Sequence, residues 1–246
     1  MQALDAPTIL GVIPARGGSK SVPRKNVRLL GKKPLLAYTI QEAAKSRYLH
    51  RLVLTTDDDE IAGVGRRLGA EVPFLRPAEL AGDDVTDLPV FRHCLDWLAA
   101  NEGFVPDIVV HLRPTSPLRT VEHIDRGIRL LLEHPEADAV RSVCPAGQHP
   151  LKTWRVEGES LYPYVPESVY GISEAYNRPR QALPAAYVQN GSVDVVRTRV
   201  ITEGNSMTGR VIVPLVMEEA ESVNIDSRVD WQLAEMMLRD ADPGKD

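Results

Sequence analysis

Cysteines and long apolar runs are scarce in this chain of 246 residues. The two cysteines, Cys94 and Cys144, are too few for a disulfide framework, and their separation fits no metal-binding signature. We therefore expect two reduced, buried thiols in a cytoplasmic protein. No apolar run approaches the roughly 20 residues that a membrane-spanning helix needs. The N-terminus also lacks the basic-then-apolar pattern of a signal peptide.

Acidic residues are absent between Asp5 and Glu42. The basic residues of this stretch are Arg16, Lys20, Arg24, Lys25, Arg28, Lys32 and Lys33. Their charge of +7 leaves −12 for the rest of a chain whose total is −5. An acidic protein with one concentrated basic segment is not a general polyanion binder, which argues against a nucleic-acid or membrane partner. The pattern predicts a site for a small, highly charged anion.

Apolar runs alternate with helical patterns over most of the chain. The predicted strands cover residues 9–14, 51–56, 71–75, 107–112, 139–143, 211–216 and 222–225. The predicted helices begin at Pro34 and near residue 57, or cover residues 87–100, 121–133 and 229–239. This alternation predicts an α/β fold with a mostly parallel sheet covered on both faces. The length suits a single domain over residues 1–246, with a proline- and tyrosine-rich, irregular or β-rich insertion at about residues 145–205.

Residues 14–26 follow the first predicted strand and are rich in glycine, serine and basic residues. Glycines allow close approach of the backbone, and successive N–H groups can cradle phosphate oxygens. Arg16, Lys20 and Lys25 would neutralise a polyphosphate and its transition-state charge. The alternative is a solvated basic loop, but the strand directs this loop to the sheet edge where α/β folds bind ligands. The glycine spacings of P-loop nucleoside triphosphatases and of dehydrogenases are absent.

Asn224 and Asp226 lie on one face of a predicted strand, because side chains alternate along a strand. Mg²⁺ usually takes one or two carboxylates together with substrate phosphates, so these two oxygen ligands suit it. Alternatively, Asp226 caps the last helix. The loop at residues 113–119 follows another strand and offers hydrogen-bonding groups on Ser116 and Arg119.

Seven segments in a fixed order carry a family resemblance. They are Ala-Arg-x-x-Ser-Lys at residues 15–20 with Lys25-Asn26, then residues 75–80, 114–119, 149–153 and 179–184, then Asn190-Gly191 and Ile225-Asp226. Together they resemble the CMP-sialic acid synthetases, or acylneuraminate cytidylyltransferases, from about Ile9 to Leu238. The resemblance implies a Rossmann-like nucleotidyltransferase fold and a homodimer paired through the insertion. It also implies transfer of CMP from CTP to the anomeric hydroxyl of a nonulosonic acid, with release of pyrophosphate.

The resemblance assigns roles to individual residues. The implied catalytic residues are Arg16, Lys20, Lys25 and Asp226. The implied nucleotide-binding residues are Ala15, Arg16, Gly17, Ser19, Lys20, Lys25, Asn26 and Arg76. The implied substrate-binding residues are Arg113, Ser116, Lys152, Arg180, Asn190 and Asp194, with Arg180 reaching across from the partner subunit. The implied Mg²⁺ ligands are Asp226 as the main ligand and Asn224 as a secondary one.

Departures from the family pattern cluster on the acceptor side. Arg113 replaces a glutamine, Asp194 replaces a tyrosine that is common three residues after Asn-Gly, and Asn224 replaces an aspartate. Arg113 and Asp194 either contact the substrate or pair with each other. We expect an acceptor other than N-acetylneuraminate, such as legionaminate or pseudaminate. The alternatives are a deoxy-octulosonate or phosphonate acceptor, and a nucleotide-binding module without turnover.

Overall fold

The structure, a computed structural model, describes residues 6–241. Residues 1–5, where a signal-peptide pattern would begin, lie outside this range. The strands are β1 (Ile9–Pro14), β2 (Leu29–Leu30), β3 (Lys33–Pro34), β4 (Arg51–Thr55), β5 (Ile108–His111), β6 (Ala139–Pro145), β7 (Trp154–Glu157), β8 (Ser160–Pro163), β9 (Tyr187–Arg197) and β10 (Ile212–Val216). The α-helices are α1 (Leu35–Ala43), α2 (Asp59–Arg67), α3 (Asp87–Glu102), α4 (Val121–Glu133), α5 (Glu167–Tyr170), α6 (Thr198–Thr202) and α7 (Arg228–Ala241).

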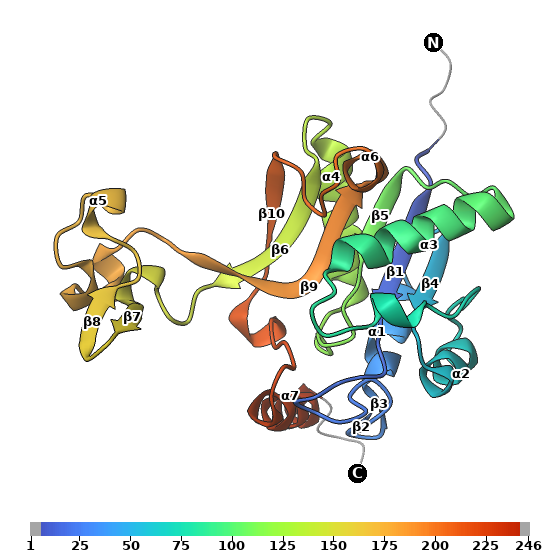
Figure 1. Ribbon diagram of the computed structural model, residues 1–246, viewed down its shortest axis with the longest axis horizontal. Coiled ribbons are helices and arrows are strands. Elements are labelled where there is room, and N and C mark those ends of the chain that lie inside the picture. Colours follow the sequence, from blue (N-terminus) through green and yellow to red (C-terminus); the bar gives the residue numbers. More distant parts are fainter. Residues whose placement is uncertain (1–5, 242–246) are drawn as a thin grey trace.

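The central sheet is mostly parallel, which confirms the predicted α/β fold. Its strand order is β10-β6-β9-β5-β1-β4 (Figure 1). β1 pairs in parallel with β4 and β5, and β10 pairs in parallel with β6. β9 runs antiparallel to both of its neighbours, β5 and β6. The carboxyl ends of β1, β4 and β5 therefore meet at one edge of the sheet.

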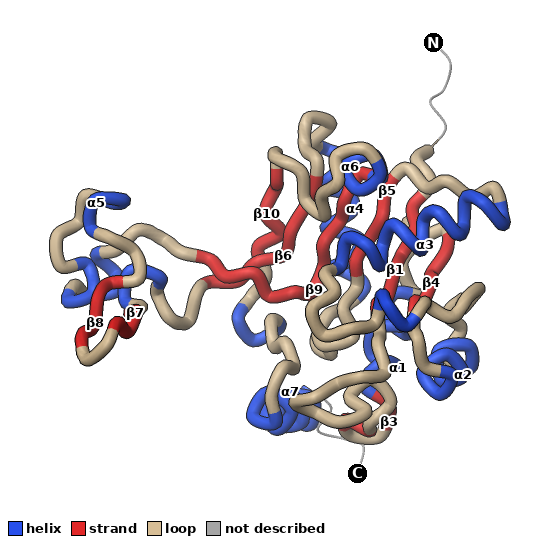
Figure 2. The backbone as a smooth tube through the Cα atoms, in the orientation of Figure 1, coloured by secondary structure: helices blue, strands red, loops and turns tan. Residues whose placement is uncertain are grey.

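Helices cover both faces of this sheet, and Figure 2 shows α3 crossing one of them. Side chains of α1, α2 and α4, such as Leu36, Ile61 and Ile128, join one buried cluster. Side chains of α3 and α6, such as Phe91 and Ile201, join the other. The short strands are nearly all apolar because both of their faces are buried. No helix among residues 6–241 has the length and apolar character needed to cross a membrane.

Residues 146–186, here called the arm, project away from the sheet at the ends of β6 and β9 (Figure 1). The arm contains the β7–β8 hairpin and the single turn α5. Its own apolar cluster is small and centres on Leu151, Ala175 and Leu183.

Two predicted strands and the bounds of the predicted insertion are corrected. In the segment predicted as a strand at residues 71–75, Glu71 forms a single bridge to Val53, and Pro73 has no N–H to continue a ladder. Residues 222–225 form no strand. β9 begins inside the segment expected to be an insertion, at Tyr187. Its Gly191 has a φ of +68°, next to an irregular register with β6, so the residue pattern resembles a turn although the strand is central.

Candidate functional site

A pocket of about 470 Å³ opens at the carboxyl edge of the sheet. The loops after β1 and β5, the segment at residues 80–87 and the residues just before α7 form its walls. Its lining includes Arg16, Ser19, Lys20, Lys25, Asn26, Arg76, Asp83, Asp87, Arg113, Asn224 and Asp226. Residues from distant parts of the sequence therefore meet where parallel strands end, which is the usual ligand position in open α/β sheets.

Two cations of the loop after β1 are paired with one carboxylate. The Arg16 Nη1 donates to the carbonyl oxygen of Gly82 at 2.8 Å and lies 2.9 Å from Asp83 Oδ1. The Lys20 ammonium forms an ion pair with Asp83. The pKa of Asp83 is held below its usual value mainly by Lys20 and to a smaller extent by Arg16. These cations line an open pocket, and the anion that they bind in this structure is a side chain.

Lys25 and Asn26 fix the end of the same loop. The Lys25 ammonium donates to the carbonyl oxygen of Ile225 at 2.7 Å and lies 3.7 Å from Asp226 Oδ1. Burial lowers the pKa of Lys25, and the charge of Asp226 acts in the opposite direction. The buried Asn26 donates from Nδ2 to the carbonyl oxygen of Arg16 at 3.0 Å. The loop after β1 is thereby tied both to itself and to the residues before α7.

Ala15 and Gly17 shape the loop and are not among the residues that line the pocket. Ala15 is buried, and its N–H donates to the carbonyl oxygen of Thr55 at 3.0 Å. The Gly17 N–H donates to Asp57 Oδ1 at 3.0 Å. A Cβ atom at Gly17 would lie 2.8 Å from Asp58 Oδ2, so the close approach of the two loops requires glycine. The backbone of Gly17 therefore packs against the loop that contains Asp57 and Asp58.

Arg76 is buried in the pocket wall. Its guanidinium donates to the carbonyl oxygens of Thr55 at 3.0 Å and Leu80 at 3.2 Å. Its Nε has no hydrogen-bond partner among the described residues. Burial lowers the pKa of Arg76, and the charge of Asp57 partly offsets this. Arg76 therefore supports the start of the segment at residues 80–87 and carries a spare donor.

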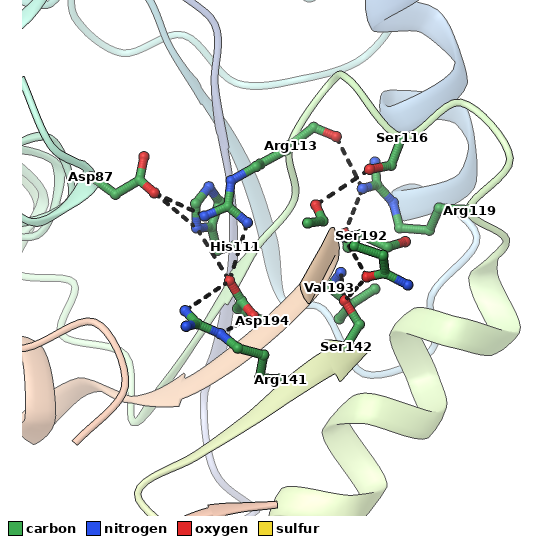
Figure 3. Close-up of polar contacts among 12 residues, drawn as sticks. Asp87, His111, Arg113, Ser116, Arg119, Arg141, Ser142, Ser192, Val193 and Asp194 are labelled. Atoms are coloured by element: carbon green, nitrogen blue, oxygen red, sulfur yellow. Dashed lines mark hydrogen bonds and ion pairs between the residues drawn. The ribbon is translucent and has the colours of Figure 1, made fainter. Parts of the chain in front are cut away.

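Arg113 and Asp194 pair with each other, as one of the two alternatives from the sequence predicts (Figure 3). Arg113 Nη1 donates to Asp194 Oδ2 at 3.2 Å, and Arg113 Nη2 donates to Asp87 Oδ2 at 2.9 Å. Arg141 Nε donates to the other oxygen of Asp194 at 3.0 Å. Arg113 lines the pocket, whereas Asp194 is buried and is not part of the lining.

Ser116 and Asn190 are buried outside the pocket lining. Ser116 Oγ donates to the carbonyl oxygen of Gly191 at 3.3 Å. Asn190 Oδ1 accepts from Ser142 Oγ at 2.6 Å, and its Nδ2 donates to Ser222 Oγ at 2.9 Å. These contacts join the loop after β5, the strand β9 and the residues before α7 behind the pocket.

Arg119 anchors the loop after β5 from within the core. It is fully buried and donates to the carbonyl oxygens of Ser192 at 2.7 Å and Arg113 at 3.0 Å (Figure 3). A third hydrogen bond, at 2.5 Å, goes to Thr39 Oγ1. Burial lowers the pKa of Arg119 to about 9. The loop is thus fixed by a buried cation as well as by its prolines.

Asn224 and Asp226 remain adjacent although they form no strand. Asn224 Nδ2 donates to Asp226 Oδ2 at 2.5 Å. Asp226 does not cap α7, because Ser227 Oγ accepts from the Asp230 N–H at 3.2 Å and Asp230 returns a bond to the Ser227 N–H at 2.7 Å. The helix-capping alternative for Asp226 is therefore wrong, and its largely exposed carboxylate faces the pocket.

Asn224 and Asp226 fit a Mg²⁺ ion that takes most of its ligands from phosphates and water. Among residues 6–241, no three His, Cys, Asp or Glu side chains gather into a metal site. The Asn224 Oδ1 is buried and has no hydrogen-bond partner among the described residues, and the Asp226 carboxylate is largely exposed. Mg²⁺ commonly binds one or two protein oxygens together with phosphates and waters. These residues suit that arrangement rather than a cage made only of protein ligands.

Lys152 and Arg180 lie in the arm and are not among the residues that line the pocket. The Lys152 ammonium donates to the carbonyl oxygens of Tyr176 at 3.2 Å and Arg178 at 2.6 Å. Arg180 Nη2 donates to the carbonyl oxygen of Ala146 at 2.6 Å. The structure therefore does not bring these two predicted substrate ligands to the pocket of their own chain.

Two carboxylates of the pocket were not predicted from the sequence. Asp83 and Asp87 lie on the segment at residues 80–87 and pair with the predicted cations. The only sequence signal was the acidic cluster that follows the Arg76-Pro77 segment. Such clusters are usually solvated helix starts, so the signal is weak without the fold.

Comparisons with known proteins agree with the geometry. The sequence profile of the cytidylyltransferase family matches residues 10–170. The chain is 34% identical to the CMP-N,N'-diacetyllegionaminic acid synthase of Legionella pneumophila, over 94% of this chain and 96% of that protein. It is 30% identical to the N-acylneuraminate cytidylyltransferase of Escherichia coli, over 92% of this chain and 51% of that protein. The solved structure of CMP:2-keto-3-deoxy-manno-octonic acid synthetase complexed with CTP matches with a TM-score of 0.69 at 14% identity, covering 95% of this chain and 99% of that one.

Proposed function

This chain belongs to the cytidylyltransferase family, and we propose that it transfers CMP from CTP to the anomeric hydroxyl of a nonulosonic acid. It is a nucleotidyltransferase enzyme, and pyrophosphate is its second product. The observation that carries the proposal is a single pocket lined both by Arg16, Lys20 and Lys25 and by Arg113. That pocket offers cations for a triphosphate and a further cation for an acid.

The reaction needs little covalent participation by the protein. The anomeric hydroxyl attacks the α-phosphorus of CTP, and the bond to the leaving pyrophosphate breaks. Positioning and charge neutralisation supply most of the catalysis in phosphoryl transfer. Arg16, Lys20 and Lys25 bind the triphosphate and stabilise the negative charge that grows on the leaving group. Asn26 and Arg76 hold the loops that frame the nucleoside, through the bonds to Arg16 and Leu80.

Mg²⁺ is the proposed cofactor, with Asp226 as its main protein ligand and Asn224 as a secondary one. When bound, the ion would neutralise phosphate charge as a Lewis acid. The buried, unpartnered Asn224 Oδ1 and the exposed Asp226 carboxylate support this assignment. Lys25, whose ammonium lies 3.7 Å from Asp226 Oδ1, helps to hold that carboxylate at the pocket.

The proposed acceptor is an acid of the legionaminate type rather than N-acetylneuraminate. Its support is Arg113, where sialate synthetases have a glutamine, together with the identity to the legionaminic acid synthase of Legionella pneumophila. Arg113 places a fixed positive charge at the acceptor side of the pocket. A guanidinium pairs with a carboxylate through its planar fork. Because all of these acids carry a carboxylate, the preference for legionaminate rests on the identity to the synthase of Legionella pneumophila.

We propose a homodimer in which the arm reaches the partner subunit. The arm exposes large apolar side chains, among them Trp154, Leu161, Tyr164 and Val169. Exposed apolar patches of this kind mark interaction sites. In the dimer, Lys152 and Arg180 would serve the acceptor site of the partner. The two free, buried cysteines further support a reducing compartment such as the cytoplasm.

An acceptor panel tests the proposed function. The protein is incubated with CTP, Mg²⁺ and, separately, N,N'-diacetyllegionaminate, pseudaminate, N-acetylneuraminate and a deoxy-octulosonate, and pyrophosphate release is measured. We expect release with a nonulosonate and the highest kcat/KM with the legionaminate. Binding of CTP without release for any acid would contradict the enzyme assignment. Best turnover on N-acetylneuraminate would contradict the acceptor assignment alone.

A further inference from the structure

The two carboxylates that hold Arg113 differ sharply in exposure. The Asp194 side chain is 2% exposed, whereas that of Asp87 is 40% exposed. Arg141 also donates to Asp194, from Nε and from Nη2, so this carboxylate is held by two arginines (Figure 3). Within residues 6–241, Asp87 forms an ion pair with Arg113 at 2.9 Å, and the imidazole of His111 lies 3.9 Å away. Asp194 is therefore held in place, whereas another carboxylate could replace Asp87 on Arg113.

Asp87 loses little when it releases Arg113. It is the first residue of α3, directly after the N-cap Thr86. The positive end of a helix dipole stabilises a carboxylate in the first turn. Asp87 also reaches solvent at the pocket mouth, so it would not be buried and unpaired after release.

Arg113 lies beside the proposed metal ligands. A Cβ atom on Gly191 would lie 3.5 Å from Arg113 Cδ, 3.6 Å from its Nη1 and 3.8 Å from Asn224 Oδ1. The guanidinium and the amide therefore flank the same glycine. In the ring form of an α-keto sugar acid, one carbon carries both the carboxylate and the anomeric hydroxyl. A carboxylate bound to Arg113 would thus bring the attacking hydroxyl towards Asn224 and Asp226.

We propose that Asp87 occupies the position of the acceptor carboxylate on Arg113 and is displaced when the acceptor binds. A bidentate pair with a carboxylate needs two parallel N–H groups on one edge of the guanidinium, and Asp87 holds one terminal nitrogen of Arg113. Asp194 is a positioning residue, since it keeps the other terminal nitrogen in place throughout. This inference rests on the proposed function and names the group that selects its acceptor as a free acid.

The first test compares the variants Asp87→Asn and Asp84→Asn. Asp84 is an exposed residue of the same segment, so its variant removes the same charge without touching Arg113. We expect Asp87→Asn to lower KM for the best acid of the panel by about two- to fivefold, the range of an exposed ion pair. KM for CTP should stay the same in both variants. An unchanged or raised acceptor KM in Asp87→Asn, or an equal fall in Asp84→Asn, would overturn the exchange.

The second test uses the methyl ester of the same acid, which has no charge to exchange. The KM advantage of Asp87→Asn should disappear with the ester, and an equal advantage would contradict the proposal. For Asp194→Asn we expect a raised acceptor KM with an unchanged CTP KM; a loss of stability alone would remove the positioning role. Failure of the proposed function is distinct, because the unmodified protein would then release no pyrophosphate with any acid.

Discussion

Asp194 offers the sharpest test of the energetics at this site. Its carboxylate accepts three hydrogen bonds, one from Arg113 and two from Arg141, at 3.0–3.3 Å. The substitution Asp194→Asn keeps the volume of the side chain, so it opens no cavity. It removes the charge and turns one acceptor into an N–H₂ group that faces a guanidinium.

The expected cost follows from burial. Removing one partner of a buried ion pair destabilises a protein by roughly 3–5 kcal/mol. Here the remaining arginines are 24% and 26% exposed and regain some hydration, which favours the lower end of that range. We expect the free energy of unfolding to fall by about 3 kcal/mol. For a chain of this size, each kcal/mol lowers Tm by roughly 2–4 °C, so Tm should fall by about 6–12 °C.

Urea and thermal unfolding at pH 7 measure this loss, with Asp87→Asn as the matched control. Asp87 bonds the same arginine but is exposed, so its removal should cost under about 1 kcal/mol. A double variant of Asp194→Asn with Arg141→Gln should cost less than the sum of the two single variants, because both lose the same bonds. Equal costs for Asp194→Asn and Asp87→Asn would refute the argument from burial.

Three further predictions follow from the same contacts. Lys20→Ala should lower kcat/KM at least tenfold while leaving Tm within about 2 °C, because Lys20 is exposed and pairs with the exposed Asp83; steady-state kinetics and a thermal scan check both parts, and unchanged turnover would remove Lys20 from the phosphate site. Asp226→Asn should raise the Mg²⁺ concentration needed for half-maximal activity without lowering Tm, since Ser227 caps α7; a Mg²⁺ titration decides it. Burial holds the pKa of His111 well below 6.5. The folded state therefore keeps His111 neutral, and stability is lost as the pH falls below 6.5 because only the unfolded chain takes the proton, at up to about 1.4 kcal/mol per pH unit. Urea unfolding from pH 7 to 5 should show a shallower loss for His111→Gln, and an equal slope would contradict this.

The strands and helices of the core could be predicted because their residue patterns are local. An all-apolar run such as β1 indicates a strand buried on both faces, and the pattern of α4 indicates a helix with one buried face. The central position of β9 could not be predicted, since Asn190-Gly191 resembles a turn and only the neighbours β5 and β6 make it a strand.

The sequence by itself identified the basic loop that supplies Arg16, Lys20 and Lys25 to the pocket. Seven basic residues without an acidic neighbour, placed after a buried strand, point to a phosphate-binding loop wherever the chain folds. The ion-pair partners of these basic residues could not be predicted from the sequence, because pairing depends on distances between segments far apart in the chain. Only the tertiary structure showed that Asp83 and Asp87 hold the predicted cations, that Asp194 is buried beside two arginines, and that Ser227 rather than Asp226 caps α7. The local composition of a segment determines the sign of the ions that it attracts, whereas the fold determines which charged side chains come close enough to pair with it.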